Sequence, residues 1–155
     1  MEKSYKNTDN LNYAKEAPTY FYDGNLAIPL VDLTPYQKMQ IVRGGVTKTY
    51  LTKLKDETSL DYDALAQALS VTRSTLINKK GEQKFSDHIS EGIIALAEIY
   101  SFGYEVFEDK DNFNNWMFAP NQALSAATPF DLMDNQFGRE EVRNLIGGIA
   151  YGLYS

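Results

Sequence analysis

The chain of 155 residues is long enough for one ordinary domain or for two small modules that share a core. Its 43% hydrophobic and 13% aromatic residues exclude a wholly disordered chain, and the absence of cysteine excludes a disulfide framework, a thiolate metal site and a thiol nucleophile. The net charge of −6, taken as a whole, argues against a nucleic-acid partner.

The charges are, however, unevenly distributed along the chain. Residues 34–84 contain nine Lys and Arg against five Asp and Glu, whereas residues 85–155 contain three against eleven. A basic middle and an acidic end predict two different surfaces for two different partners.

The N-terminal residues 1–33 are expected to form a flexible or extended arm. The turn residues Asp23, Gly24 and Asn25 and the interrupting Pro29 predict a loose tail followed by an extended piece. The arm could reach a partner, but a frayed terminus is the favoured interpretation. Because no apolar run is long enough to cross a bilayer and MEKSYKNTDN lacks the apolar core of a signal peptide, we expect a soluble cytoplasmic protein without a membrane contact.

Two short helices are predicted next. Thr34 and Pro35 open the first helix, and Gly44 and Gly45 close it. Thr47 caps the second helix, whose apolar side holds Tyr50, Leu51 and Leu54. Its solvent side is expected to carry Lys48, Lys53 and Lys55.

Residues 59–81, with the sequence SLDYDALAQALSVTRSTLINKKG, have the pattern of a helix-turn-helix. Asp61 caps the first helix, Ser70 and Val71 make the turn, and Thr72 caps the second helix. Leu76 and Ile77 supply the apolar side of that second helix, and Gly81 ends it. Ser70 departs from the usual pattern, because such turns commonly carry Gly in a left-handed conformation that costs another residue roughly 1 kcal/mol.

The exposed face of the second helix suits a contact with the DNA major groove. Arg binds guanine edges, Asn binds adenine edges, and Ser, Thr and Lys bind phosphates. The predicted DNA-binding residues are Thr72, Arg73, Ser74, Thr75, Asn78, Lys79 and Lys80. The alternative is a plain helical hairpin with a solvated basic face.

A long helix is predicted from about Ser86, with an apolar stripe that joins the two halves of the chain or forms a homodimer seam. The stripe contains Ile89, Ile93, Leu96, Ala97, Tyr100, Tyr104 and Phe107. His88, the only histidine, has no second histidine or cysteine with which to share a metal ion, so we expect a surface residue and no metal site. A short helix over residues 111–117 follows, in which Trp116 is expected to be a core anchor.

Residues 128–155, TPFDLMDNQFGREEVRNLIGGIAYGLYS, predict a capped turn and then a helix. Thr128 and Pro129 open the turn, and the helix is expected to start near Gly138, with Glu140 and Glu141 in its first turn. Its apolar stripe contains Val142, Leu145, Ile146, Ile149 and Leu153. Gly147 and Gly148 interrupt this stripe at a cost of roughly 1 kcal/mol each, which indicates that another backbone comes close.

These residues resemble the C-terminal toxin-binding domain of Xre-type antitoxins, the partners of RES-domain toxins. The shared pattern is Thr-Pro-hydrophobic-acidic-Leu at residues 128–132, Gly-Arg-x-x-Val at residues 138–142, and Gly-hydrophobic-Tyr-small at residues 152–155. The resemblance extends upstream to the helix-turn-helix and covers about residues 46–155. Residues 125–127, Ser-Ala-Ala, depart from the Gly-Gly pair that is usual in the family.

The resemblance implies an all-α fold with a helix-turn-helix domain over residues 34–85, joined by the long helix to a toxin-binding domain over residues 86–155. It implies an antitoxin that occludes the active site of a cognate NAD-consuming RES-domain toxin, and that represses its own operon as a homodimer bound to operator DNA. The implied toxin-binding residues are Arg139, Arg143, Gly147, Gly148, Tyr151, Gly152, Leu153, Tyr154 and Ser155. Neither a cofactor nor a small-molecule substrate is implied.

A stand-alone helix-turn-helix regulator, in which the C-terminal half dimerises or binds an effector, is the alternative function. An enzyme is not expected, because the chain has one isolated histidine, no P-loop and no Gly-x-Gly-x-x-Gly motif. Glu140 and Glu141 are adjacent and therefore point in different directions on a helix.

Overall fold

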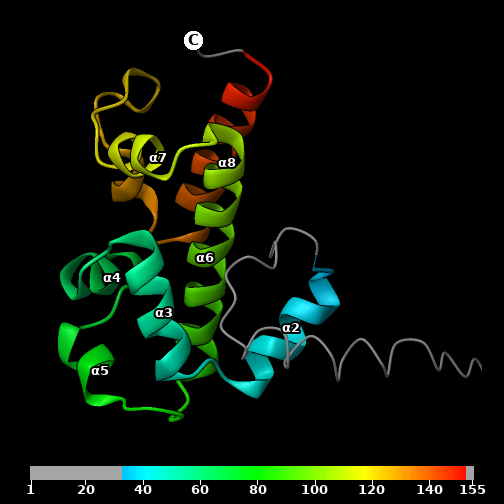
Figure 1. The fold of residues 1–155 in the computed structure, drawn as a ribbon, viewed down its shortest axis with the longest axis vertical. Helices are drawn as coiled ribbons and strands as arrows, with labels where there is room; N and C mark the ends of the chain where they lie inside the picture. Colours follow the sequence, from blue (N-terminus) through cyan, green and yellow to red (C-terminus); the bar gives the residue numbers. More distant parts are fainter. Residues whose placement is uncertain (1–32, 153–155) are drawn as a thin grey trace, which may run out of the picture.

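The computed structural model describes residues 33–152, which fold into helices (Figure 1). In chain order these are α2 (Pro35–Gly44), α3 (Lys48–Thr58), α4 (Tyr62–Leu69), α5 (Arg73–Asn78), α6 (Asp87–Phe107), α7 (Lys110–Met117), the 3-10 helices η2 (Gln122–Leu124) and η3 (Pro129–Leu132), and α8 (Gln136–Ala150). In this part of the chain the only β pairing is an isolated bridge between Thr47 and Lys84. The predicted all-α fold class is confirmed. The N-terminal arm predicted for residues 1–33 lies, except for Leu33, outside the described residues.

The first five helices begin at the residues that the sequence predicted. Thr34 accepts a hydrogen bond from the amide of Gln37, whose side chain accepts one from the amide of Thr34 in return. A side-chain cap of this kind satisfies an amide that has no partner inside the helix. The same local bond, to the amide three residues ahead, starts the next four helices at Thr47, Asp61, Thr72 and Ser86.

Helix α6 is the central element of the fold. Its 21 residues contact α2, α3 and α4 towards one end and α7 and α8 towards the other (Figure 1). Ile93, Leu96 and Tyr100, which belong to the predicted apolar stripe, are fully buried. One cluster of buried side chains extends from Ile41 in α2 to Ile146 in α8, and α6 therefore supplies core to both halves of the chain.

The far end of α6 holds an aromatic cluster around Phe113 of α7. Phe113 is fully buried, and its ring contacts Tyr100, Tyr104, Phe107 and Trp116 at centroid distances of 5.2 to 5.9 Å. Gly103 makes room for it, because a Cβ at that position would lie 2.1 Å from the Phe113 ring. Trp116 is half-buried against this cluster, as expected of a core residue.

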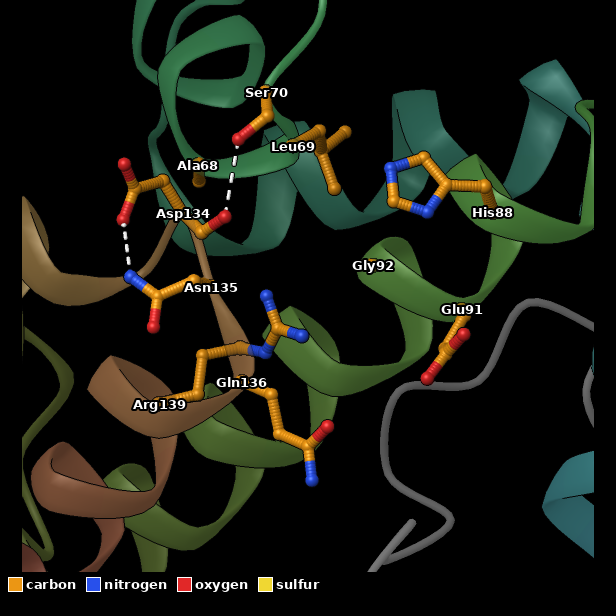
Figure 2. Close-up of a pocket in the computed structure, with 10 residues that line it drawn as sticks. All are labelled: Ala68, Leu69, Ser70, His88, Glu91, Gly92, Asp134, Asn135, Gln136 and Arg139. Carbon is orange, nitrogen blue, oxygen red and sulfur yellow. Dashed lines mark hydrogen bonds between the residues drawn. The ribbon is translucent and has the colours of Figure 1, made fainter.

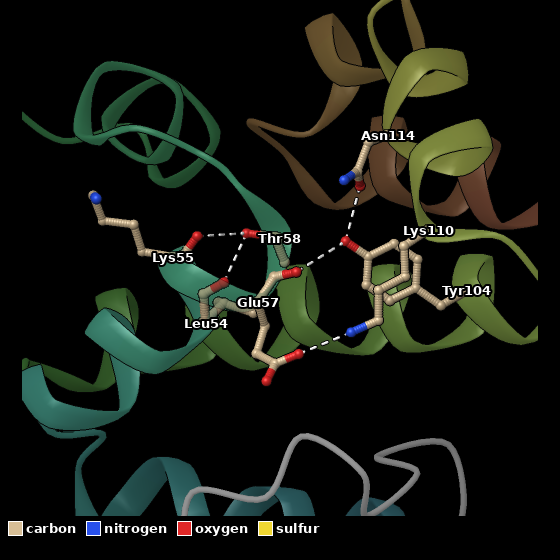
Figure 3. Close-up of polar contacts among 7 residues, drawn as sticks. All are labelled: Leu54, Lys55, Glu57, Thr58, Tyr104, Lys110 and Asn114. Atoms are coloured by element: carbon tan, nitrogen blue, oxygen red, sulfur yellow. Dashed lines mark hydrogen bonds and ion pairs between the residues drawn. The ribbon is translucent and has the colours of Figure 1, made fainter.

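Polar contacts tie the end of α3 to the same region (Figure 3). The Tyr104 hydroxyl lies 2.8 Å from Oδ1 of Asn114 and 3.4 Å from the carbonyl oxygen of Glu57. Lys110 forms an ion pair of 2.9 Å with the Glu57 carboxylate. Residues of α3, α6 and α7 are therefore held together beyond their apolar packing.

Helix α8 begins at Gln136, two residues before the predicted start at Gly138. The cap is Asn135, whose side-chain oxygen accepts a hydrogen bond of 2.9 Å from the Gly138 amide. As a consequence Glu140 and Glu141 lie beyond the first turn, and their predicted place in it is wrong. Gly138 is needed for packing instead, because a Cβ there would lie 1.9 Å from the Leu132 carbonyl oxygen and would separate α8 from η3.

Candidate interaction surfaces

Helices α4 and α5 pack against each other and are joined by residues 70–72, as the helix-turn-helix pattern predicts for this segment. Ser70 adopts the left-handed conformation, with φ at +54°, and the Val71 amide donates to the carbonyl of Ala66. Leu76 is fully buried and holds α5 against the core. The Ser70 hydroxyl donates to the Asp134 carbonyl at 3.0 Å, just before α8 (Figure 2). That bond gives a physical reason for serine rather than glycine in the turn.

The predicted DNA-binding residues lie on α5, on its N-cap Thr72 and on the two residues that follow the helix. Thr75 and Lys79 are half-buried, and the other five, Thr72, Arg73, Ser74, Asn78 and Lys80, are exposed. Arg73 makes one loose ion pair with Asp63 of α4, at 3.7 Å, and both side chains remain exposed. Five of the seven side chains suited to phosphate and base contacts are thus exposed to solvent.

Helix α5 ends at Asn78, and the prediction that it continues to Gly81 is wrong. The carbonyl of Leu76, which a longer helix would pair with the amide of Lys80, accepts instead from Nζ of Lys48. The Lys80 amide donates to the side chain of Gln83 at 2.9 Å. Lys79 has extended backbone, so the last two predicted DNA-binding residues follow the helix and do not belong to it.

Two side chains near α5 point differently from the prediction. Lys48 was expected outward but is only 8% exposed, with Nζ on the Leu76 carbonyl and 4.7 Å from the centroid of the Tyr62 ring. The aliphatic part of the Lys48 side chain is buried, and its length places the charged amino group at the carbonyl end of α5. Ile77 was expected on the apolar side but is 41% exposed, since Leu76 alone fills the core position.

The two arginines predicted to bind the toxin have partners inside this chain. Arg139 is half-buried, and its Nη1 donates to the Met133 carbonyl at 3.1 Å. Burial lowers the pKa of the Arg139 guanidinium, which still stays charged at neutral pH. Arg143 is exposed, with Nη2 3.7 Å from a carboxylate oxygen of Glu98 on α6. The arginines therefore help to seat α8, whatever else they contact.

The remaining predicted toxin-binding residues lie at the end of α8. Gly147 is half-buried and Gly148 is buried, whereas Tyr151 is 85% exposed and Gly152 has φ at +71°. Among the described residues, no atom outside the backbone of α8 lies within 4 Å of the place where a Gly147 Cβ would stand. Within residues 33–152, therefore, no other backbone packs closely against Gly147, contrary to what the sequence indicated. Leu153, Tyr154 and Ser155 lie outside the described residues.

A cavity of 310 Å³ lies where α4, the start of α6 and the start of α8 meet. Figure 2 shows Arg139 and Asp134 on one side of it and His88 and Glu91 on the other. His88 is exposed, as the sequence predicted. Between residues 33 and 152 no group of three or more His, Asp or Glu could hold a metal ion, and no helix there is long and apolar enough to cross a membrane.

Sequence reasoning overlooked Phe137, the second residue of α8. Its side chain is 80% exposed. A detectable pattern was present: Phe137 precedes Val142 by five residues, which at about 100° per residue places it roughly 140° away from that core position. Its place off the apolar stripe of its own helix therefore predicts an exposed ring, which a partner could contact.

Comparison with known proteins gives two matches. Residues 103–152 match the sequence model of the antitoxin Xre/MbcA/ParS C-terminal toxin-binding domain. The antitoxin Xre of Photorhabdus laumondii subsp. laumondii is 29% identical over 117 residues, which cover 74% of this chain and 79% of that protein. The matched domain begins in the second half of α6 and includes α7, η3 and α8. These matches confirm the resemblance of the chain to Xre-type antitoxins, and the similarity to the Xre/MbcA/ParS C-terminal toxin-binding domain covers residues 103–152.

Proposed function

We propose that this chain is the antitoxin of a toxin–antitoxin pair whose toxin is an NAD-consuming enzyme of the RES-domain class. The observation that carries the proposal is the match of residues 103–152 to a toxin-binding domain. The class of toxin rests on the family resemblance. The exposed Tyr151 beside Gly152 provides an aromatic side chain at the end of α8, and tyrosine is enriched among the residues that dominate interface energies.

The proposed mechanism is occlusion, in which residues 151–155 enter the active-site cleft of the toxin. Tyr151 fills part of the cleft, and the positive φ of Gly152 turns the chain sharply after the last helical turn. The acidic C-terminal half suits a cleft that binds a phosphate-bearing dinucleotide, because such a cleft presents positive charge. This chain performs no chemistry in the process.

The second part of the proposal is repression of its own operon in the cytoplasm. Arg73, Ser74 and Asn78 enter the major groove of operator DNA as a helix-turn-helix, with Lys79 and Lys80 on phosphates. The exposed Ile77 adds an apolar group of the kind that contacts a thymine methyl. A homodimer would match a two-fold operator. Helix α5 and the last turn of α8 lie at opposite ends of the molecule, which leaves room for both partners (Figure 1).

The toxin is tested by expressing the neighbouring reading frame with and without this chain, while cellular NAD and growth are measured. We expect NAD to fall when the neighbour is expressed alone and to recover on co-expression. A chain that ends at Gly152 should fold with the same helical content but fail to restore NAD. Full rescue by that shortened chain would refute occlusion by the C-terminal residues.

The DNA contact is tested with a fragment of the promoter. Arg73→Ala and Asn78→Ala should each weaken binding at least tenfold, and each should leave toxin inhibition unchanged. Arg43→Ala removes the same charge from an exposed position on α2 and serves as the control. If the neighbouring product is harmless and the chain still binds its promoter, the stand-alone regulator replaces the antitoxin.

A further inference from the structure

The outward side of α8 carries an exposed aromatic stripe. Phe137 and Tyr151 are 80% and 85% exposed, the two highest values among the large hydrophobic side chains that the structure describes. Fourteen residues separate them, so at 1.5 Å per residue they stand about 21 Å apart along the axis and within about 40° of each other around it. Glu141 and Asn144, also exposed, lie between them on the same side.

This stripe is separate from the side by which α8 packs on the body. Val142, Leu145 and Ile146 are buried and face the core, to which α6 and η3 contribute. Removing the Phe137 ring would therefore leave the core of α8 intact. A partner can therefore cover the exposed Phe137 ring without disturbing the packing of α8.

We propose that the toxin contact extends along α8 to Phe137, which serves as a second aromatic anchor 14 residues before Tyr151. This inference rests on the proposed function. Both residues lie within the matched toxin-binding domain, and Gly147, with open space beside it, lies about one helical turn before Tyr151. A specific interface has about 20 to 30 residues on each side, which a contact limited to residues 151–155 does not supply.

The charges beside Phe137 define the chemistry of the surface that receives it. Asp134, Glu140 and Glu141 are exposed around it. The complementary toxin surface is an apolar pocket bordered by Lys or Arg. A second copy of this chain fits less well, because a two-fold contact centred on this side of α8 would bring the Glu141 carboxylates of the two copies together.

The test measures the affinity of the purified full chain for the purified product of the neighbouring reading frame. Phe137→Ala should weaken binding at least tenfold, and Glu141→Lys should weaken it in low salt more than in high salt. Tyr36→Ala removes another exposed aromatic ring, on α2, and should change the affinity less than twofold. Phe137→Ala should keep the melting temperature and promoter affinity of the parent chain, because the ring supports neither the core nor α5.

Two outcomes would overturn the inference while leaving the proposed function intact. In the first, Phe137→Ala binds the toxin as tightly as the parent chain does. In the second, light scattering finds that Phe137→Ala turns an oligomer into a monomer, which would assign this side of α8 to contact between copies. If the parent chain itself fails to bind the neighbouring product, the proposed function fails, and this inference fails with it.

Discussion

The open space beside Gly147 allows a test in which folding and binding respond with opposite signs. Gly147 lies inside α8, and no described atom outside the backbone of that helix is within 4 Å of the Cβ position. Gly147→Ala therefore adds a methyl group without a clash and reduces the freedom of the unfolded chain. We expect the free energy of unfolding to rise by about 0.5–1 kcal/mol.

Toxin binding should respond in the opposite direction. If the backbone of the toxin lies against Gly147, the added methyl group intrudes into a packed interface, which typically costs about 1–3 kcal/mol. A loss of that size weakens the affinity roughly 5- to 150-fold. A more stable protein that binds its partner less tightly is hard to explain by any defect of folding.

Urea unfolding and calorimetric titration with the toxin measure the two effects on the same protein. Gly44→Ala is the matched control, because Gly44 is also helical with open space at its Cβ but lies in α2, outside the residues that match the toxin-binding domain. Unchanged or tighter toxin binding by Gly147→Ala would refute the idea that this glycine admits a partner backbone. A lower free energy of unfolding for Gly147→Ala would contradict the open space at the Gly147 Cβ position.

Three further predictions concern the fold. Gly103→Ala places a carbon 2.1 Å from the Phe113 ring. It should lower the unfolding free energy, measured by urea titration, by about 1–3 kcal/mol, even though alanine favours a helix more than glycine does. A variant as stable as the parent chain would contradict this packing. Ser70→Ala keeps a positive φ and loses the hydrogen bond to Asp134, so it should lower the unfolding free energy by about 1 kcal/mol. Ser70→Gly loses the same bond but relieves the strained backbone, so its unfolding free energy should be near that of the parent. Equal losses in the two variants would contradict this reasoning. Burial raises the pKa of Tyr104 from 10.0 to about 12, and burial also raises the pKa of Tyr50 and Tyr100. These folded-state pKa values exceed the unfolded ones, so the contribution of the buried, protonated tyrosines to stability is complete below about pH 10 and is lost as the pH rises through about 12. An absorbance titration of phenolate, followed alongside circular dichroism, would detect this loss.

The starts of α2 to α6 could be predicted because a cap is a local event, whereas the equally local cap of α8 at Asn135 was not predicted. Thr34, Thr47 and Thr72 each bond to an amide three residues ahead, so a short window of sequence holds all the information. The end of α5 could not be predicted in this way. It depends on Lys48, which lies 28 residues before the Leu76 carbonyl that it binds. No local pattern indicates that a lysine from α3 will take a carbonyl of α5.

The same distinction separates the two candidate surfaces. On α5 the turn and cap residues predict the buried Leu76 correctly, but not the exposed Ile77, and the DNA-binding role of α5 stays a prediction. On α8 the motif identified Arg139 and Arg143, but not that Met133 and Glu98 would engage them. The apolar stripe of α8 does not indicate Phe137, because that residue lies off the stripe and is 80% exposed.

The predicted division of the chain at residue 85 lies between the two proposed binding surfaces, but it does not separate two cores. Ile93 of α6 is buried at the end where α6 contacts α2 and α4, and Tyr100 is buried beside Phe113 of α7, seven residues further along the same helix. A fragment that stopped at residue 85 would expose the apolar side chains that α6 covers, and a fragment that began there would lose the contacts of Glu57 with Tyr104 and Lys110. The match to the toxin-binding family likewise begins at residue 103, inside α6. A ligand that shifts one end of α6 would therefore act on the same packed core that surrounds its other end. For this reason the proposed DNA binding and toxin binding have to be measured on the whole chain.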